Sequence, residues 1–321
     1  MSIKPLLLRL RTLLILGRVS NLPTVWSNLI VGWALGEGDL SEFAPLGLLL
    51  AGGSLLYIGG MYLNDFCDAD FDARYCPERP IPSGKISRAT VGWLALIAFL
   101  TGIACLAFLG IAPTLVALLL AAAIVLYDFR HKGVAWAPWI MGLCRALLYL
   151  AGMSAVLGLQ VFSQARLLWP EYLMAITLGI YVAGITLFAR GESKPQKPTR
   201  WSLILLLMPV LVQAGIHIAY PSPFPLSTFF QTWPWGITFP FYLWFAWWIP
   251  YCLLLLGWMT WLLVPFWRGT KPSIGRVVSG LLAGIVFVDM IAWAGAPNAE
   301  PPLLLPLFLL ALLLQRIIPA T

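Results

Sequence analysis

The sequence predicts an all-α protein, a polytopic transmembrane helical bundle of nine or ten spans. Of its 321 residues, 60% are hydrophobic and only 10% are charged, and the mean hydropathy of +0.88 lies far outside the range of soluble proteins. The apolar residues form runs of helix-spanning length, separated by short polar breaks. Because backbone survives in lipid only as a helix or a closed barrel, and these runs do not alternate as barrel strands would, helices are predicted.

Ten apolar runs divide the chain, and their boundaries are expected to hold to a few residues. The tenth run is short and flanked by proline, so it either spans thinly or lies at the interface. No internal repeat is evident, and residues 1–321 are predicted to form a single domain. The runs lie at 22–36, 44–63, 90–109, 112–127, 136–158, 171–189, 202–219, 240–264, 277–295 and 301–315.

Residues 1–18 precede the first run. The stretch from Pro5 to Gly17 is apolar but is interrupted by Arg9 and Arg11, and no small-residue cleavage site follows it. An amphipathic helix at the membrane interface is therefore favoured over a removable signal peptide.

The net charge of +7 indicates membrane topology and not affinity for nucleic acid, because the basic residues are spread through the loops between apolar runs. They gather before the first run and after the second, fourth, sixth and eighth runs, whereas the intervening loops are mainly acidic, with Arg166 as the exception. The positive-inside rule predicts an integral, multi-pass membrane protein whose N-terminus and aspartate-rich loops face the cytoplasm.

Five of the thirteen acidic residues lie in the segment 64–88, which we interpret as an aspartate-rich cytoplasmic loop. If the second helix continues through it, Asn64, Asp68 and Asp72 are spaced i, i+4, i+8 and share one face, with Asp65 rotated only slightly from it. Carboxylates on one face repel one another, so the arrangement is costly unless cations hold it together. Such oxygen ligands suit Mg²⁺, which prefers a few carboxylates together with the phosphate oxygens of a substrate.

The alternative is a solvated acidic helix end, since charge runs are usually solvated faces. In a membrane protein, however, ionisable groups at the edge of a span mark ion or substrate paths. The following segment 77–85 adds rigid turns and cations beside the acids. Metal and substrate binding is therefore the favoured interpretation.

These residues resemble a known family, the UbiA-type intramembrane prenyltransferases. The first motif of that family, Asn-Asp-x-x-Asp-x-x-x-Asp, matches Asn64, Asp65, Asp68 and Asp72 without a gap. The segment 79–84, with the sequence Arg-Pro-Ile-Pro-Ser-Gly, is similar to the loop that follows the motif. The resemblance implies catalytic roles for the four motif residues and Mg²⁺ ligation by its three aspartates.

The resemblance covers most of the chain, including the segments 20–26 and 127–132 and the number and orientation of the spans. It implies a helical bundle around a central cavity, with a polyprenyl diphosphate held through Mg²⁺ at the cytoplasmic mouth and its tail in the bilayer. The other implied partners are a hydrophobic acceptor of unknown identity and membrane lipid.

The second motif of the family, two aspartates four residues apart at the end of the sixth span, is where this sequence departs. In the corresponding loop, 190–200, Glu192 can stand for one acid as a catalytic and metal-binding residue, but the position four before it is Phe188. A second magnesium site is therefore weakened, rebuilt with Arg190 and Lys194 as phosphate contacts, or absent.

Basic residues near these motifs are predicted to bind the substrate. Arg145 lies within the fifth run and must face the interior, where contact with phosphate or acceptor is favoured over an ion pair; Asp289 in the ninth run is one candidate partner. For Lys132, a purely topological role is an equal alternative. The full predicted set is Arg74, Arg79, Lys132, Arg145, Arg190 and Lys194.

The predicted function is Mg²⁺-dependent transfer of a polyprenyl group from a prenyl diphosphate to an acceptor within the membrane. Two alternative functions remain compatible with the sequence. One is a noncatalytic UbiA-like protein that binds or transports a prenylated or amphipathic molecule, which the missing acid at Phe188 motivates. The other is a prenyl diphosphate cyclase, which would share the ionisation step but need no acceptor.

Overall fold

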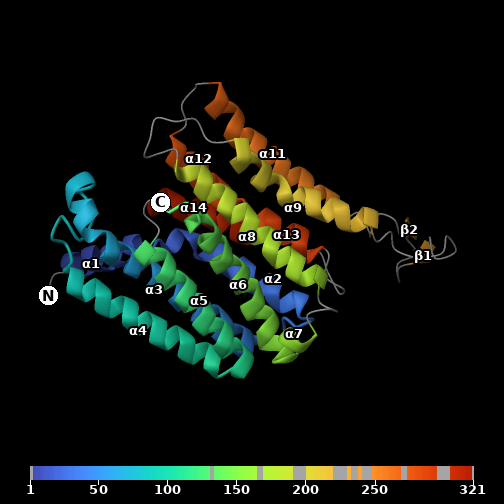
Figure 1. The fold of residues 1–321 in the computed structure, drawn as a ribbon, viewed down its shortest axis with the longest axis horizontal. Coiled ribbons are helices and arrows are strands. Elements are labelled where there is room, and N and C mark those ends of the chain that lie inside the picture. Colours follow the sequence, from blue (N-terminus) through green and yellow to red (C-terminus); the bar gives the residue numbers. More distant parts are fainter. Residues whose placement is uncertain are drawn as a thin grey trace.

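The computed structural model describes residues 3–130, 134–164, 169–190, 200–219, 230–232, 238–240, 248–268, 273–294 and 304–319. These residues are helical apart from turns and one pair of short antiparallel strands, which confirms the predicted all-helical class. The long helices run side by side in one bundle (Figure 1). In chain order the elements are α1 (Ile3–Leu16), η1 (Val19–Asn21), α2 (Leu22–Leu35), α3 (Phe43–Tyr75), α4 (Arg88–Ala107), α5 (Ile111–Arg130), α6 (Ala137–Leu157), α7 (Gln160–Ser163), α8 (Trp169–Ala189), α9 (Arg200–Ala219), β1 (Phe230–Thr232), β2 (Thr238–Pro240), α11 (Trp248–Trp267), α12 (Ile274–Ala283), α13 (Ile285–Trp293) and α14 (Leu305–Ile317).

Within the described residues, seven helical segments are long and apolar enough to cross a membrane. They are α3, α4, α5, α6, α8, α11 and the consecutive pair α12 and α13. Three further predicted runs form shorter apolar helices: α2, the stretch Trp201–Ile216 of α9, and α14. The chain is an integral membrane protein, and the predicted total of nine or ten spans is not confirmed by helix length.

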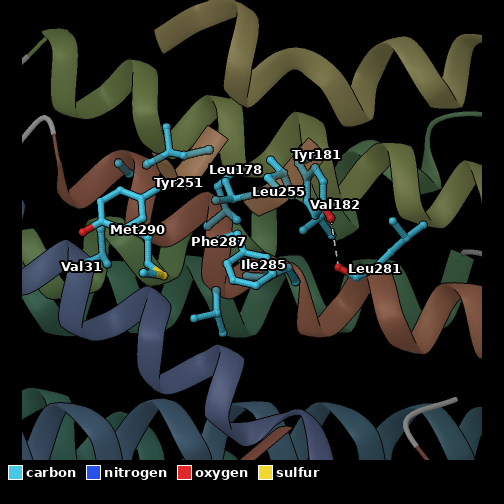
Figure 2. Packing of buried hydrophobic residues seen from close by; sticks show 14 of the residues in the cluster. Val31, Leu178, Tyr181, Val182, Tyr251, Leu255, Leu281, Ile285, Phe287 and Met290 are labelled. Atoms are coloured by element: carbon cyan, nitrogen blue, oxygen red, sulfur yellow. Dashed lines mark hydrogen bonds between the residues drawn. The ribbon is translucent and has the colours of Figure 1, made fainter. Parts of the chain in front are cut away.

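Helices α2 and α6 lie between two apolar clusters. One cluster joins α2 and α6 to α3, α4 and α5, through residues such as Leu29, Leu56 and Leu147. The other joins α2 and α6 to α8, α9 and α11 through α14, and Figure 2 shows part of it, including the hydrogen bond from the Tyr181 hydroxyl to the backbone oxygen of Leu281. The two central helices therefore connect the N-terminal and C-terminal parts of the bundle.

Glycine allows α2 and α6 to approach closely. A Cβ atom on Gly32 would lie 2.3 Å from the backbone oxygen of Tyr149, and one on Gly152 would lie 2.5 Å from the backbone oxygen of Leu29. Small residues at such crossings let backbones meet in membrane bundles, where dispersion contacts supply much of the packing energy. The spacing between the central helices thus depends on these two glycines.

We expect Gly152→Ala to lower the free energy of unfolding by about 1–3 kcal/mol, because the added methyl group meets backbone that cannot move aside. The matched control is Gly47→Ala in α3, where an added Cβ meets nothing within 4 Å. Thermal unfolding of the detergent-purified protein measures both variants. Equal unfolding temperatures for the two would contradict this account of the crossing.

The segment predicted as an aspartate-rich loop, 64–88, is helical in its first half. Helix α3 extends to Tyr75, and Pro77 follows shortly after its end, so only 76–87 connects α3 to α4. Gly84 turns this connection with a φ of 73°, and Ser87 caps α4 by accepting a hydrogen bond from the backbone N–H of Thr90. The interpretation of 64–75 as loop was therefore wrong, because the helix continues beyond its apolar part.

Candidate active site

Four polar side chains lie together on the face of α3 that turns into the bundle. Asn64, Asp65, Asp68 and Asp72 have exposed fractions of 9%, 8%, 9% and 4%. The side chain of Asp70, on the opposite side of the same helix, is 81% exposed. The predicted shared face, which followed from the spacing i, i+4, i+8, is confirmed by this difference in burial.

Two arginines from outside α3 contact these carboxylates. The guanidinium of Arg79, in the connection after α3, lies 2.8 Å from Asp72 Oδ2 and 3.8 Å from Asp65 Oδ1. Arg18, between α1 and η1, lies 3.7 Å from Asp65 Oδ1. Partial burial works to lower the pKa of Arg79, but the hydrogen bond and charge of Asp72, together with the charge of Asp65, outweigh it and raise that pKa. The four side chains Asn64, Asp65, Asp68 and Asp72 form what we call the acidic face of α3. Arg18 and Arg79 are the cations that hold this face together.

A second helix adds another carboxylate. Asp128, in the last turn of α5, is buried, and Asn64 Nδ2 donates a hydrogen bond to its Oδ1 at 3.0 Å. Asp68 and Asp128 both line a cavity of about 320 Å³ at this end of the bundle. The lining residues are Phe66, Cys67, Asp68, Arg88, Asp128, Phe129, Arg130 and Val134.

Three charged side chains at this site, those of Arg18, Arg88 and Asp128, were not assigned to it from the sequence. Arg18 and Arg88 were interpreted only as loop cations that mark topology. Asp128 had a usable signal, because an acid at the end of an apolar run is expected to serve a specific purpose. Its pairing with Asn64 joins helices that are distant in sequence, so spacing along one helix could not have predicted it.

The predicted substrate-binding cations fall in different places. Arg79 joins the acidic face, and Arg190, which follows α8, donates a hydrogen bond to the backbone oxygen of Val134 at the cavity. Arg74 is exposed, on the side of α3 that faces away from the buried acids. Lys132, Glu192 and Lys194 lie outside the described residues. Phe188 is fully buried, with its ring centroid 5.5 Å from that of Phe266.

Arg145 lies deeper in the bundle than the acidic face. Its guanidinium donates to Thr24 Oγ1 at 3.2 Å and to Asn28 Oδ1 at 2.9 Å, and lies 5.8 Å from the ring centre of Tyr57. Tyr57 precedes Asn64 by seven residues on α3, which is about 10 Å along the helix axis. The predicted contact between Arg145 and phosphate remains a prediction that this geometry does not favour.

Asp289, on α13, forms the centre of the same buried network. It is 0% exposed and accepts hydrogen bonds from Asn28 Nδ2 at 2.8 and 2.9 Å, from the Tyr149 hydroxyl at 2.6 Å and from the Ser27 hydroxyl. Asn28 connects it to Arg145, because its amide oxygen accepts from the arginine while its amide nitrogen donates to the aspartate. Among the described residues Arg145 and Asp289 form no direct ion pair, and Asn28 bridges them instead.

The acidic face fits Mg²⁺ as a partial ligand set. Among the described residues, no group of three His, Cys, Asp or Glu side chains is close enough to hold a metal ion. Mg²⁺ is commonly bound through one or two carboxylates together with substrate phosphates, so a closed cage is not required. The carboxylates of Asp65, Asp68 and Asp72 have the chemistry for that arrangement, and their metal-binding role stays a prediction.

Comparison with known proteins gives a family match over most of the chain. The pattern of the UbiA prenyltransferase family matches residues 22–285. Digeranylgeranylglyceryl phosphate synthase of Methanothermobacter thermautotrophicus is 33% identical over 128 residues, which are 40% of this chain and 41% of that protein. The enzyme of the same name from Methanopyrus kandleri is 31% identical over 124 residues, which are 39% of this chain and 45% of that protein. The matched region thus spans under half the length of these relatives.

Two solved structures share the fold. The apo structure of a UbiA homolog from Aeropyrum pernix K1 superposes with a TM-score of 0.62 at 16% identity, covering 85% of this chain and 96% of that chain. A structure of digeranylgeranylglyceryl phosphate synthase superposes with a TM-score of 0.55 at 20% identity, covering 94% of this chain and 98% of that chain. At these identities the likeness concerns the arrangement of the helices.

Proposed function

Because the chain belongs to the UbiA prenyltransferase family, as its first motif indicated, we propose that it transfers a polyprenyl group from a prenyl diphosphate to an acceptor within the membrane, in a Mg²⁺-dependent reaction. One observation carries the proposal: the four motif side chains are buried on one face of α3, at one end of an apolar bundle. Buried carboxylates are costly unless cations compensate them. A site for a metal and a diphosphate accounts for that cost.

Asp65, Asp68 and Asp72 would hold the metal, with Asn64 in support. When bound, Mg²⁺ supplies Lewis-acid stabilisation of the charge that develops on the diphosphate as the carbon–oxygen bond breaks. Arg18 and Arg79 are within reach of the same carboxylates and are placed to donate hydrogen bonds to phosphate oxygens once a metal neutralises the acids. The prenyl chain would extend along the apolar interior.

The substrates for a first assay follow from the names of the matched relatives. We propose geranylgeranyl diphosphate as the donor and geranylgeranylglyceryl phosphate as the acceptor, since the relatives are named for a digeranylgeranylglyceryl phosphate product. The basic residues at the ends of alternate runs support a cytoplasmic position for the site.

The test uses the purified wild-type protein in lipid nanodiscs, with Mg²⁺ and radiolabelled donor, with and without acceptor. We expect diphosphate release together with an acceptor-derived product, and loss of both when EDTA removes the metal. Product mass identifies the reaction. Binding of the donor without turnover would contradict the proposal and favour a noncatalytic binder, and a hydrocarbon or prenyl alcohol formed without acceptor would favour a cyclase.

A further inference from the structure

The contact between Asn64 and Asp128 joins the α3 motif to α5. Asn64 Nδ2 lies 3.0 Å from Asp128 Oδ1, and both side chains are buried. We infer that Asp128 is a positioning residue, which fixes the orientation of the Asn64 amide toward the metal and diphosphate. The inference rests on the proposed function, because it assigns a task within that same site.

The chemistry of the two side chains supports this role. An amide has a donating nitrogen and an accepting oxygen, and Asn64 Nδ2 is the atom that donates to Asp128 Oδ1. The amide oxygen of Asn64 is therefore directed away from Asp128. Asparagine oxygens are suitable ligands for hard cations, and amide nitrogens are not. A carboxylate at position 128 thus decides which amide atom Asn64 presents to the site.

The position of Asp128 on its own helix argues against a purely local purpose. It lies in the last turn of α5, where the partial negative charge of the helix end disfavours an acid. It is buried there with an exposed fraction of 5%, which adds a desolvation cost. Asp68, a motif residue, lines the same cavity. The positioning of Asn64 explains why an aspartate is present where the helix end and burial both disfavour it.

A simple structural link between α3 and α5 is the competing explanation, and a double-mutant cycle separates the two. The variants are Asp128→Ala, Asp128→Asn, Asn64→Ala and the double variant Asn64→Ala with Asp128→Ala. The first readout is binding of Mn²⁺ in the presence of inorganic pyrophosphate, followed by electron paramagnetic resonance. The second is kcat/KM for prenyl transfer.

We expect Asp128→Ala to weaken Mn²⁺ binding by about 10–100-fold, the usual loss when a group that orients a metal ligand is removed. Asp128→Asn should fall between wild type and Asp128→Ala, because its amide oxygen can still accept but its nitrogen allows the reversed orientation of Asn64. In the Asn64→Ala background, removing Asp128 should cost little more, since its target is gone.

Two results would overturn the inference: Mn²⁺ binding by Asp128→Ala within a factor of about two of wild type, or an equal loss with and without Asn64. If Asp128→Ala does not fold, the nearly isosteric Asp128→Asn takes its place in the cycle, where an equal loss of Mn²⁺ binding with and without Asn64 would overturn the inference. A wild-type protein that turns over no substrate would instead refute the proposed function, so the two failures are distinguishable.

Discussion

Replacement of Asp68 by asparagine is expected to abolish prenyl transfer, lowering kcat/KM by about a thousandfold, the loss typical when one group that stabilises developing charge is removed. Asp68 is the central acid of the buried face and also lines the cavity, so it is the motif residue best placed to share a metal with a diphosphate. Asparagine keeps the size of the side chain but removes its charge. The measurement is release of diphosphate from geranylgeranyl diphosphate in the presence of acceptor and saturating Mg²⁺.

The matched control is Asp70→Asn, the same substitution two residues along the same helix. Asp70 is exposed and pairs with Arg88 at 3.1 Å, an exposed ion pair whose loss costs about 1 kcal/mol or less. We expect this variant to keep its activity. If Asp68→Asn kept as much activity as Asp70→Asn, the buried carboxylates of α3 would have no role in the reaction.

Replacement of Asp289 by alanine is expected to lower the free energy of unfolding by about 3–5 kcal/mol, the loss measured when one partner of a buried charge network is removed. The change leaves the donors of Ser27, Asn28 and Tyr149 without their shared acceptor, and it removes a carboxyl group that interacts electrostatically with buried Arg145. The network joins α2 and α6 to α13, so its loss weakens the connection between the two parts of the bundle. Denaturant unfolding in detergent micelles measures the effect.

Ser154→Ala provides the control for this prediction. Ser154 is fully buried on α6, two residues after Gly152 at the crossing with α2. Its hydroxyl donates a hydrogen bond to the backbone oxygen of Ala151 in its own helix. We expect a change of about 1 kcal/mol or less, because no donor or charge on another helix loses its partner. A cost for Asp289→Ala that is no larger than that for Ser154→Ala would contradict the structural role of the network.

The sequence predicted most of what depends on one helix. Hydropathy predicted the membrane bundle, and the i, i+4, i+8 spacing predicted which acids of α3 share a face. The same reasoning misplaced the end of α3, since polar composition at 64–75 resembles a loop although the helix continues to Tyr75. Composition alone does not distinguish a polar helix from a loop when the polar side chains face a buried site.

Contacts between helices were less predictable. Asp128 and Asn64 lie 64 residues apart in sequence and on different helices, and Asp289 and Arg145 are bridged by an asparagine that no charge pattern would select. Arg74 follows Asp72 by two residues and so lies on the exposed side of the helix, which its closeness in sequence to the acids concealed. Such pairings depend on how the helices pack, and that packing cannot be deduced from a single sequence.

A structure of the protein in lipid with Mn²⁺ and a non-hydrolysable geranylgeranyl diphosphate analogue tests most directly whether the buried α3 carboxylates bind a metal and the substrate. We expect anomalous density for Mn²⁺ bonded to carboxylate oxygens of the buried α3 face, at distances close to the roughly 2.0–2.1 Å typical of Mg²⁺. The diphosphate should bridge that ion and the guanidinium groups of Arg18 and Arg79. A diphosphate bound elsewhere in the bundle, with Asp65, Asp68 and Asp72 still paired only to protein, would contradict this expectation.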